Sequence, residues 1–142
     1  MPTPALRLPV DGPCPCGRRG PASKLLAFAQ CCGPYLSDVE ARPAPDPEAL
    51  MRSRYTAFVR ERADYLLATW HPSHRPASLE FDPAVKWLGL EVKRCTPIDA
   101  THAEIEFVAR QKSPGSPAVR LHERSRFERA QGRWFYLDGD QQ

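Results

Sequence analysis

The chain has 142 residues, of which 20 are Lys or Arg and 17 are Asp or Glu, giving a formal net charge of +3. This length allows one hydrophobic core with a short appendage and excludes two full-sized domains. The longest apolar run, Leu25–Ala29, is far shorter than the roughly 20 residues of a membrane-spanning helix. We therefore expect no membrane segment and no export signal, and a cytoplasmic location. Arginine side chains are scattered among acidic ones, which argues against nucleic acid as a partner.

Four of the five cysteines lie near the N-terminus, behind a proline-rich lead-in that we expect to be extended or disordered over residues 1–12. Cys14 and Cys16 are separated by one residue, and Cys31 and Cys32 are adjacent. Zinc takes four tetrahedral thiolate ligands, and clustered thiols in a reducing compartment more often hold metal than form disulfides. The pattern predicts a small zinc knuckle. Two alternatives stay open, namely four reduced thiols without metal and a redox pair at Cys31 and Cys32.

The composition divides the chain into three parts. Residues 1–37 hold the lead-in and the cysteine knuckle, and residues 38–46 form a proline-rich polar segment that is typical of a linker. Residues 47–142 contain the periodic patterns of helices and strands, so we expect one α+β domain there.

A helix is predicted from Pro47 to about Arg60. Asp46 can accept hydrogen bonds from the free N–H groups of the first turn, proline suits the first helical position, and Glu48 complements the positive helix end. The helical wheel places Arg54 inside the apolar face, where a buried guanidinium needs a partner. The apolar residues of that face are Leu50, Met51, Tyr55 and Phe58.

A second, shorter helix is expected from about Ala63 to Thr69, because Pro72 disfavours helical geometry at His71. The apolar residues that it brings together are Tyr65, Leu66 and Trp70. His71 has two interpretations. As a cation it can close the carboxyl end of the helix, and beside aromatic residues at a pocket mouth it can transfer a proton.

From Lys86 onward the period changes from helical to alternating, which predicts strands. A loop rich in Pro, Gly and Ser at residues 111–117 joins two of them into a hairpin, and a turn at residues 130–132 leads into the last one. We expect an antiparallel meander of four strands. The later three are predicted at residues 101–110, 118–128 and 133–138.

The two faces of this predicted sheet differ in charge. Two acidic residues of one strand lie opposite three arginines of the next, so we interpret the arginine run as a solvated cross-strand charge lattice. Its members are Glu104, Glu106, Arg120, Arg124 and Arg126. The apolar face carries Glu123, whose ionised carboxylate would be costly there without a partner. Arg54 and Glu123 form the natural pair.

Five stretches of the sequence look familiar when they are taken in order. They are Cys14–Gly17, Cys31–Leu36, Leu50–Val59, Ala63–Pro72 and Glu123–Phe127. Together they resemble the uncharacterised YchJ-like bacterial family, from about residue 14 to residue 139. The cysteine part resembles the SEC-C motif, a short zinc-binding element that contacts other proteins on the protein translocation ATPase. The rest is similar to the nuclear transport factor 2 superfamily, a cystatin-like cone of curved antiparallel sheet wrapped around helices, with a pocket inside.

The resemblance implies both a metal site and a pocket. It makes four residues the ligands of one structural zinc ion: Cys14, Cys16, Cys31 and Cys32. It places six residues in the signature stretches around the pocket: Arg54, Tyr55, Tyr65, Trp70, His71 and Glu123. The chain departs from the family pattern between the cysteine pairs, where the segment is longer than usual and reads Gly-Arg-Arg-Gly in place of Gly-Ser-Gly.

Three functions are compatible with these features. The favoured hypothesis is a binding module rather than an enzyme, in which the knuckle contacts a partner protein and the cone either takes a small ligand or only acts as a scaffold. The alternative is a small-molecule enzyme of the isomerase, dehydratase or hydrolase kind, in which His71 moves a proton and Glu123 with Arg54 orients the substrate. It requires His71 and Glu123 within hydrogen-bond reach of one common point. The third is thiol redox chemistry at Cys31 and Cys32.

Overall fold

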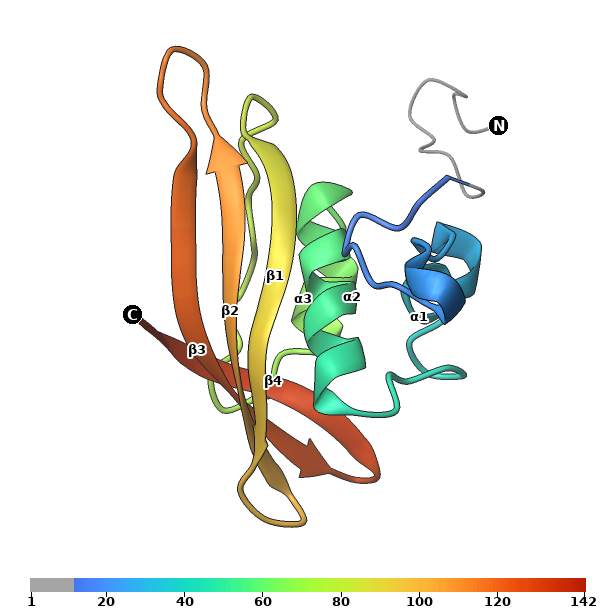
Figure 1. The fold of residues 1–142 in the computed structure, drawn as a ribbon. Coiled ribbons are helices and arrows are strands. Elements are labelled where there is room, and N and C mark those ends of the chain that lie inside the picture. Colours follow the sequence, from blue (N-terminus) through green and yellow to red (C-terminus); the bar gives the residue numbers. More distant parts are fainter. Residues whose placement is uncertain (1–11) are drawn as a thin grey trace, which may run out of the picture.

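The computed structural model describes residues 12–142, so nearly all of the predicted lead-in lies outside the described residues. Figure 1 shows a layered arrangement: a curved antiparallel sheet, then the helices α2 (Pro47–Val59) and α3 (Ala63–Ala68), then the small N-terminal knuckle. Helix α2 lies between the sheet and the knuckle. This arrangement confirms the predicted α+β fold, with a curved sheet around helices.

The two main helices begin where the sequence predicts them. Asp46 Oδ1 accepts a hydrogen bond from the backbone N–H of Ala49 at 2.7 Å, which satisfies one of the free donors of α2. Helix α2 ends one residue before Arg60. A short helix in the knuckle, α1 (Gly33–Ser37), was not expected. Within residues 12–142, no helix has both the length and the apolar character needed to cross a membrane.

The sheet is the predicted meander, with strand order β1-β2-β3-β4 and antiparallel pairing throughout. Its strands are β1 (Lys86–Pro97), β2 (His102–Lys112), β3 (Val119–Ala130) and β4 (Arg133–Gln141). The last strand continues three residues beyond the predicted end at Asp138. This extension matters, because it places Gln141 opposite Glu123 on β3.

Two of the three ladders of this curved sheet are irregular. The β1–β2 pairing has two register shifts between Trp87 and Arg94, and the β3–β4 pairing has one between Arg126 and Phe127. Extra residues of this kind bend a strand and increase its local twist. The concave face turns toward α2, as Figure 1 shows.

One hydrophobic core runs from the sheet through α2 into the knuckle. Ile105 and Phe127 of the sheet, Leu50 of α2 and Cys16 of the knuckle are each at most 1% exposed. Eight of the thirteen residues of α2 are buried, which is expected only for a helix with neighbours on both sides. The segment at residues 38–46 therefore connects two parts that share one core.

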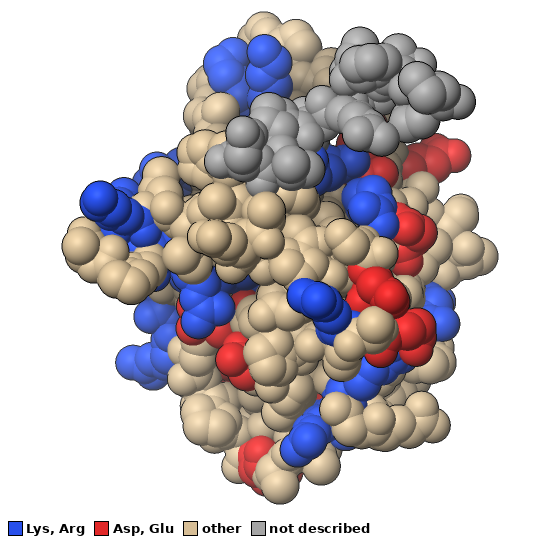
Figure 2. Space-filling model, turned by 90° about the vertical axis from the view of Figure 1, so that its right-hand side faces the viewer, with Lys and Arg blue, Asp and Glu red and all other residues tan. Residues whose placement is uncertain are grey.

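The outer face of the sheet carries charge pairs, but several partners differ from the expected ones. Glu106 pairs with His122, and Arg120 lies opposite Arg110. Arg124 Nε lies 3.8 Å from Glu104 Oε1 across the β2–β3 pair. Arg126 pairs with Asp138 and Asp140 of β4, at 2.6 and 2.7 Å. On the knuckle side of the molecule, shown in Figure 2, basic and acidic side chains are also interspersed.

Candidate functional site

The four clustered cysteines converge on one point in the knuckle. Their Sγ atoms all lie within 4.8 Å of one another, and Cys16 Sγ is 3.5 Å from Cys31 Sγ. Four thiolates around a tetrahedral zinc ion at about 2.3 Å would be about 3.8 Å apart. Cys14, Cys16 and Cys32 are buried, and Cys31 is half-buried. This donor set fits a single tetrahedral metal ion of the zinc type.

Short local turns aim the two cysteine pairs at each other. Gly17, with φ +74, closes a turn in which its N–H donates to the carbonyl of Cys14 at 3.1 Å. Cys31 and Cys32 come directly before α1. Gly33, the first residue of that helix, lies against Phe28 and so fixes the position of this pair. A Cβ atom at Gly33 would approach the carbonyl oxygen of Phe28 to 2.8 Å, so a glycine is needed there.

The long segment between the cysteine pairs folds back on itself as a narrow hairpin. Cys14 N–H donates to the carbonyl of Leu26 at 2.9 Å, and Leu26 N–H donates to that of Arg18 at 3.0 Å. Nearer the tip, Gly20 N–H donates to the carbonyl of Lys24 at 2.8 Å. Because the two ends of the segment lie side by side, its extra length does not separate the thiols.

The four thiols strongly perturb one another. Hydrogen bonds from Cys16, Cys31 and Cys32 lower the pKa of Cys14 far below its usual range. Hydrogen bonds to Cys14, Cys16 and Cys31 raise the pKa of Cys32. Four thiolates at this spacing would repel one another. A bound cation offsets this repulsion, so the thiols can lose their protons when the metal binds.

The knuckle is attached to the outer face of α2 by polar contacts. Arg52 Nη1 donates to the carbonyl of Cys16 at 3.0 Å, while its Nε donates to Glu48 one turn earlier at 2.8 Å. Cys14 Sγ lies 3.7 Å from Thr56 Oγ1. The cysteine cluster is therefore built directly against this helix.

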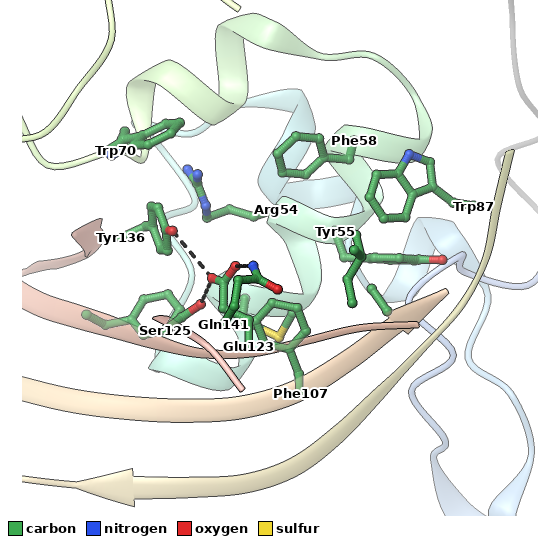
Figure 3. Close-up of a pocket in the computed structure, with 14 residues that line it drawn as sticks. Arg54, Tyr55, Phe58, Trp70, Trp87, Phe107, Glu123, Ser125, Tyr136 and Gln141 are labelled. Atoms are coloured by element: carbon green, nitrogen blue, oxygen red, sulfur yellow. Dashed lines mark hydrogen bonds between the residues drawn. The ribbon is translucent and has the colours of Figure 1, made fainter. Parts of the chain in front are cut away.

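The opposite face of α2 borders a cavity of about 220 Å³ between the helix and the concave face of the sheet (Figure 3). Seven aromatic side chains make up half of its lining: Tyr55, Phe58, Trp70, Trp87, Phe107, Phe127 and Tyr136. The remaining lining residues are Met51, Arg54, Ala109, Leu121, Glu123, Ser125 and Gln141. The cavity is thus largely apolar, with one cation and one carboxylate in its wall.

Arg54 is buried at one side of this cavity. Its Nη1 donates to the carbonyl of Leu66 and to Thr69 Oγ1, both at 2.8 Å. Its Cζ lies 4.4 Å from the ring centre of Tyr136 and 5.1 Å from that of Trp70. Burial lowers the pKa of Arg54 to about 10, so the guanidinium is still protonated at neutral pH. The side chain ties α2 to the end of α3 and to β4.

Glu123 projects from β3 into the same cavity and accepts three hydrogen bonds. Ser125 Oγ donates at 2.6 Å, and Tyr136 Oη and Gln141 Nε2 donate at 3.4 Å each. Burial raises the pKa of Tyr136 to about 12, so its hydroxyl remains a donor at neutral pH. Gly139 leaves room for the carboxylate, because a Cβ atom there would collide with it.

The expected ion pair between Arg54 and Glu123 is not formed, and this prediction was wrong. Within residues 12–142, neither side chain has an oppositely charged group within 4.0 Å, although both border the cavity. Figure 3 shows the guanidinium directed between Trp70 and Tyr136, away from the carboxylate. Nη1 of the guanidinium instead donates to the carbonyl of Leu66 near the end of α3 and to Thr69 Oγ1.

The other predicted pocket residues divide between the cavity and the core. Tyr55 and Trp70 line the cavity together with Arg54 and Glu123. Tyr65 does not, because its hydroxyl lies in the core, 2.7 Å from Ser53 Oγ.

His71 lies outside the cavity lining. Its Nε2 is 3.2 Å from Glu128 Oε2, and its Nδ1 is 2.7 Å from Ser73 Oγ. The ring packs against Phe135. The structure therefore does not bring His71 and Glu123 to one common point, which the enzyme hypothesis requires.

Several lining residues were missed by the sequence-based prediction. Ser125 shares the face of Glu123 by strand alternation, so the signal was present for this residue. Tyr136 lies on the predicted last strand, but nothing local indicates its contact with Arg54. Gln141 lies beyond the predicted end of that strand, so its place in the cavity lining follows only from the greater length of β4 in the structure.

Comparisons with known proteins agree with this architecture. The chain matches the family model described as YchJ, middle NTF2-like domain, over residues 46–139. It is 72% identical over 137 residues to a UPF0225 protein of Polaromonas sp., covering 96% of this chain and 98% of that protein. A UPF0225 protein of Bordetella parapertussis is 49% identical over 138 residues, covering 95% and 98%.

Two solved structures of SEC-C motif containing proteins share the fold. The solution structure from Rhodopseudomonas palustris has a TM-score of 0.74 and 34% identity, covering 90% of this chain and 97% of that one. The crystal structure from Psychrobacter arcticus has a TM-score of 0.76 and 30% identity, covering 91% and 82%. The chain therefore belongs to the UPF0225 family of YchJ-like proteins, whose main domain is NTF2-like.

Proposed function

We propose that this protein is a binding module that takes a small organic molecule in the cavity between α2 and the sheet. The observation that carries the proposal is the cavity itself, about 220 Å³ with aromatic walls and a hydrogen-bonded carboxylate. Ligand sites are concave and mostly apolar, with a few polar groups that fix the orientation of the ligand.

The packing around the cavity supports an occupant. Space of this kind in a protein interior costs stability, because the side chains around it lose contacts. Larger side chains at small lining positions such as Ala109 and Ser125 would fill it. The small residues at these positions keep the cavity open.

The cysteine cluster is proposed to hold one zinc ion with a structural role. Four protein thiolates complete a tetrahedral zinc site, which leaves no coordination position for a substrate. The contacts of Arg52 and Thr56 with the cluster would then hold α2 in place. Met51 and Tyr55, which precede these residues on the helix, line the cavity. The metal would thus support the wall of the ligand site.

The ligand proposal can be tested by NMR with small neutral aromatic fragments. We expect chemical-shift changes at residues of α2, β2, β3 and β4 that line the cavity. Ala109→Leu should weaken binding at least about tenfold, because the added carbons occupy the cavity. Ala118→Leu, at an exposed position outside it, is the matched control. Equal binding to both variants would contradict the proposal.

A protein contact through the knuckle is a second proposal. Leu25 is 46% exposed on the knuckle hairpin, next to Lys24 and close to Arg18 and Arg19. The basic neighbours of this side chain are suited to an acidic protein surface. Leu25→Asp should abolish cross-linking to a partner that wild-type protein captures from its own cell extract. Unchanged cross-linking would contradict this proposal.

A further inference from the structure

The two charged groups of the cavity differ in what surrounds them. Arg54 has two acceptor oxygens at 2.8 Å and the faces of two aromatic rings within 5.1 Å of its Cζ. Ring faces attract cations, so this guanidinium is already stabilised by its surroundings. The negative faces of these two rings also disfavour an anionic ligand beside the guanidinium.

The carboxylate of Glu123 has capacity for further hydrogen bonds. A carboxylate has about four lone-pair sites for hydrogen bonds. Only Ser125 is a short donor to it, at 2.6 Å, while Tyr136 and Gln141 are both 3.4 Å away. Within residues 12–142 no cationic side chain lies within 4.0 Å of it. The carboxylate can accept further hydrogen bonds from a ligand in the cavity.

Aromatic rings surround the space next to this carboxylate. In Figure 3, Phe58 and Trp87 lie across the cavity from Glu123, and Phe107 lies beside it. A carboxylate together with several ring faces is the combination that recognises organic cations. The cavity of about 220 Å³ corresponds to about seven liquid water molecules at roughly 30 Å³ each, enough for one aromatic or short aliphatic body.

We propose that the ligand of this cavity is a small protonated amine, whose N–H groups donate to Glu123 and whose apolar body packs against Phe58, Trp87 and Phe107. This inference rests on the proposed function, because it names the ligand class of the same cavity. A neutral ligand of the same shape would use the apolar walls alone.

Three probes of similar shape separate these possibilities: 2-phenylethylammonium, 2-phenylethanol and 3-phenylpropanoate. Binding of each to the full-length protein is measured by calorimetry and by the fluorescence of the tryptophans. We expect the ammonium ion to bind at least about tenfold more tightly than the alcohol, because a charge-assisted hydrogen bond is added. The propanoate should bind most weakly.

Glu123→Gln tests the role of the carboxylate. This variant should bind the ammonium ion and the alcohol within about twofold of each other, while its affinity for the alcohol stays at the wild-type value. Glu104→Gln, which removes a carboxylate on the outer face of the sheet, should keep the wild-type preference. If Glu123→Gln does not fold, wild-type protein still decides the question, because added salt should weaken binding of the ammonium ion only.

The outcomes distinguish this inference from the proposal on which it rests. Equal affinities for ammonium ion and alcohol, or a preference for the propanoate, would overturn the amine while the cavity remained a ligand site. A preference for the ammonium ion that persists in Glu123→Gln would also overturn it. No binding of any probe up to about 10 mM would overturn both.

Discussion

The two faces of helix α2 are packed in different ways. On the knuckle side, four thiols converge within 4.8 Å and the contacts close around a single point. On the sheet side, aromatic side chains pack against one another in pairs around a space of about 220 Å³. The first set of side chains fits a single metal ion, whereas the second leaves room for an organic molecule. In the function proposed above, the first region stabilises the fold and the second binds a ligand.

The largest expected effect comes from removing a cysteine of the cluster. Cys16→Ser should abolish zinc binding and lower the unfolding free energy by at least about 3 kcal/mol, near 10 °C in Tm, because metal binding to such sites is coupled to folding. Elemental analysis and thermal unfolding monitored by circular dichroism measure the two quantities. Wild-type protein treated with a chelator should lose comparable stability.

Cys95→Ser is the control for this experiment, because Cys95 is exposed and lies outside the cluster. It should retain about one zinc ion per chain and the wild-type Tm. Purified wild-type protein without zinc and with four or more reactive thiols would contradict the metal site.

Arg54→Ala should give the next largest effect, about 3 kcal/mol measured by urea unfolding. The variant loses two charge-assisted hydrogen bonds and the contacts with Trp70 and Tyr136, and it leaves a void in the core. Arg60→Ala removes a guanidinium just beyond the end of the same helix, at a less buried position, and should cost less. A loss below about 1 kcal/mol for Arg54→Ala would show that the side chain does not join α2 to α3.

The hydrogen bonds to Glu123 should contribute less. Ser125→Ala removes the donor at 2.6 Å and should cost about 1.5 kcal/mol, because a donor to a charged group is lost. Tyr136→Phe removes the donor at 3.4 Å but keeps the ring under Arg54, so about 0.5 kcal/mol is expected. Urea unfolding compares the pair directly. The reverse order would mean that the tyrosine, not the serine, holds the carboxylate.

The smallest expected effect is the coupling between the two charges of the cavity. A double-mutant cycle of Arg54→Met and Glu123→Gln should give a coupling free energy below about 0.5 kcal/mol, because no hydrogen bond or ion pair joins them. The measurement is again urea unfolding of the four proteins. A coupling of about 3 kcal/mol or more would indicate the direct buried ion pair that the structure lacks.

Local signals in the sequence were sufficient to predict the helices and strands of the main domain. Asp46 and Pro47 mark the start of α2, and alternation from Lys86 onward marks the strands of the meander. These features depend on neighbouring residues in the chain, so a single sequence contains them. The same holds for Glu123, whose place on the concave face follows from its position in β3.

The partners of long side chains could not be predicted in the same way. A helical wheel gives the face on which Arg54 lies, but not the direction in which its guanidinium reaches along the helix. That direction depends on where α3 ends, because the carbonyl of Leu66 is the acceptor. Tertiary packing decides this, and no local pattern reports it.

His71 was misplaced for a related reason. The segment after α3 pairs with β4 through a bridge between Trp70 and Tyr136, and His71 N–H donates to the carbonyl of Tyr136 at 2.8 Å. Side chains of neighbouring residues in an extended segment point to opposite sides. Since Trp70 lines the cavity, His71 faces away from it, toward Glu128.

Helix α2 has little surface that is free to vary. Arg52 and Thr56 contact the cysteine knuckle, while Met51 and Tyr55, their immediate neighbours in sequence, border the cavity. A new side chain on this helix must fit against the knuckle or the cavity wall without displacing the residues that pack on the opposite face. Seven of the twelve residues of strand β1 are exposed, and this strand faces no such double requirement. In a library of all single substitutions, we therefore expect α2 to accept the fewest replacements and β1 many more.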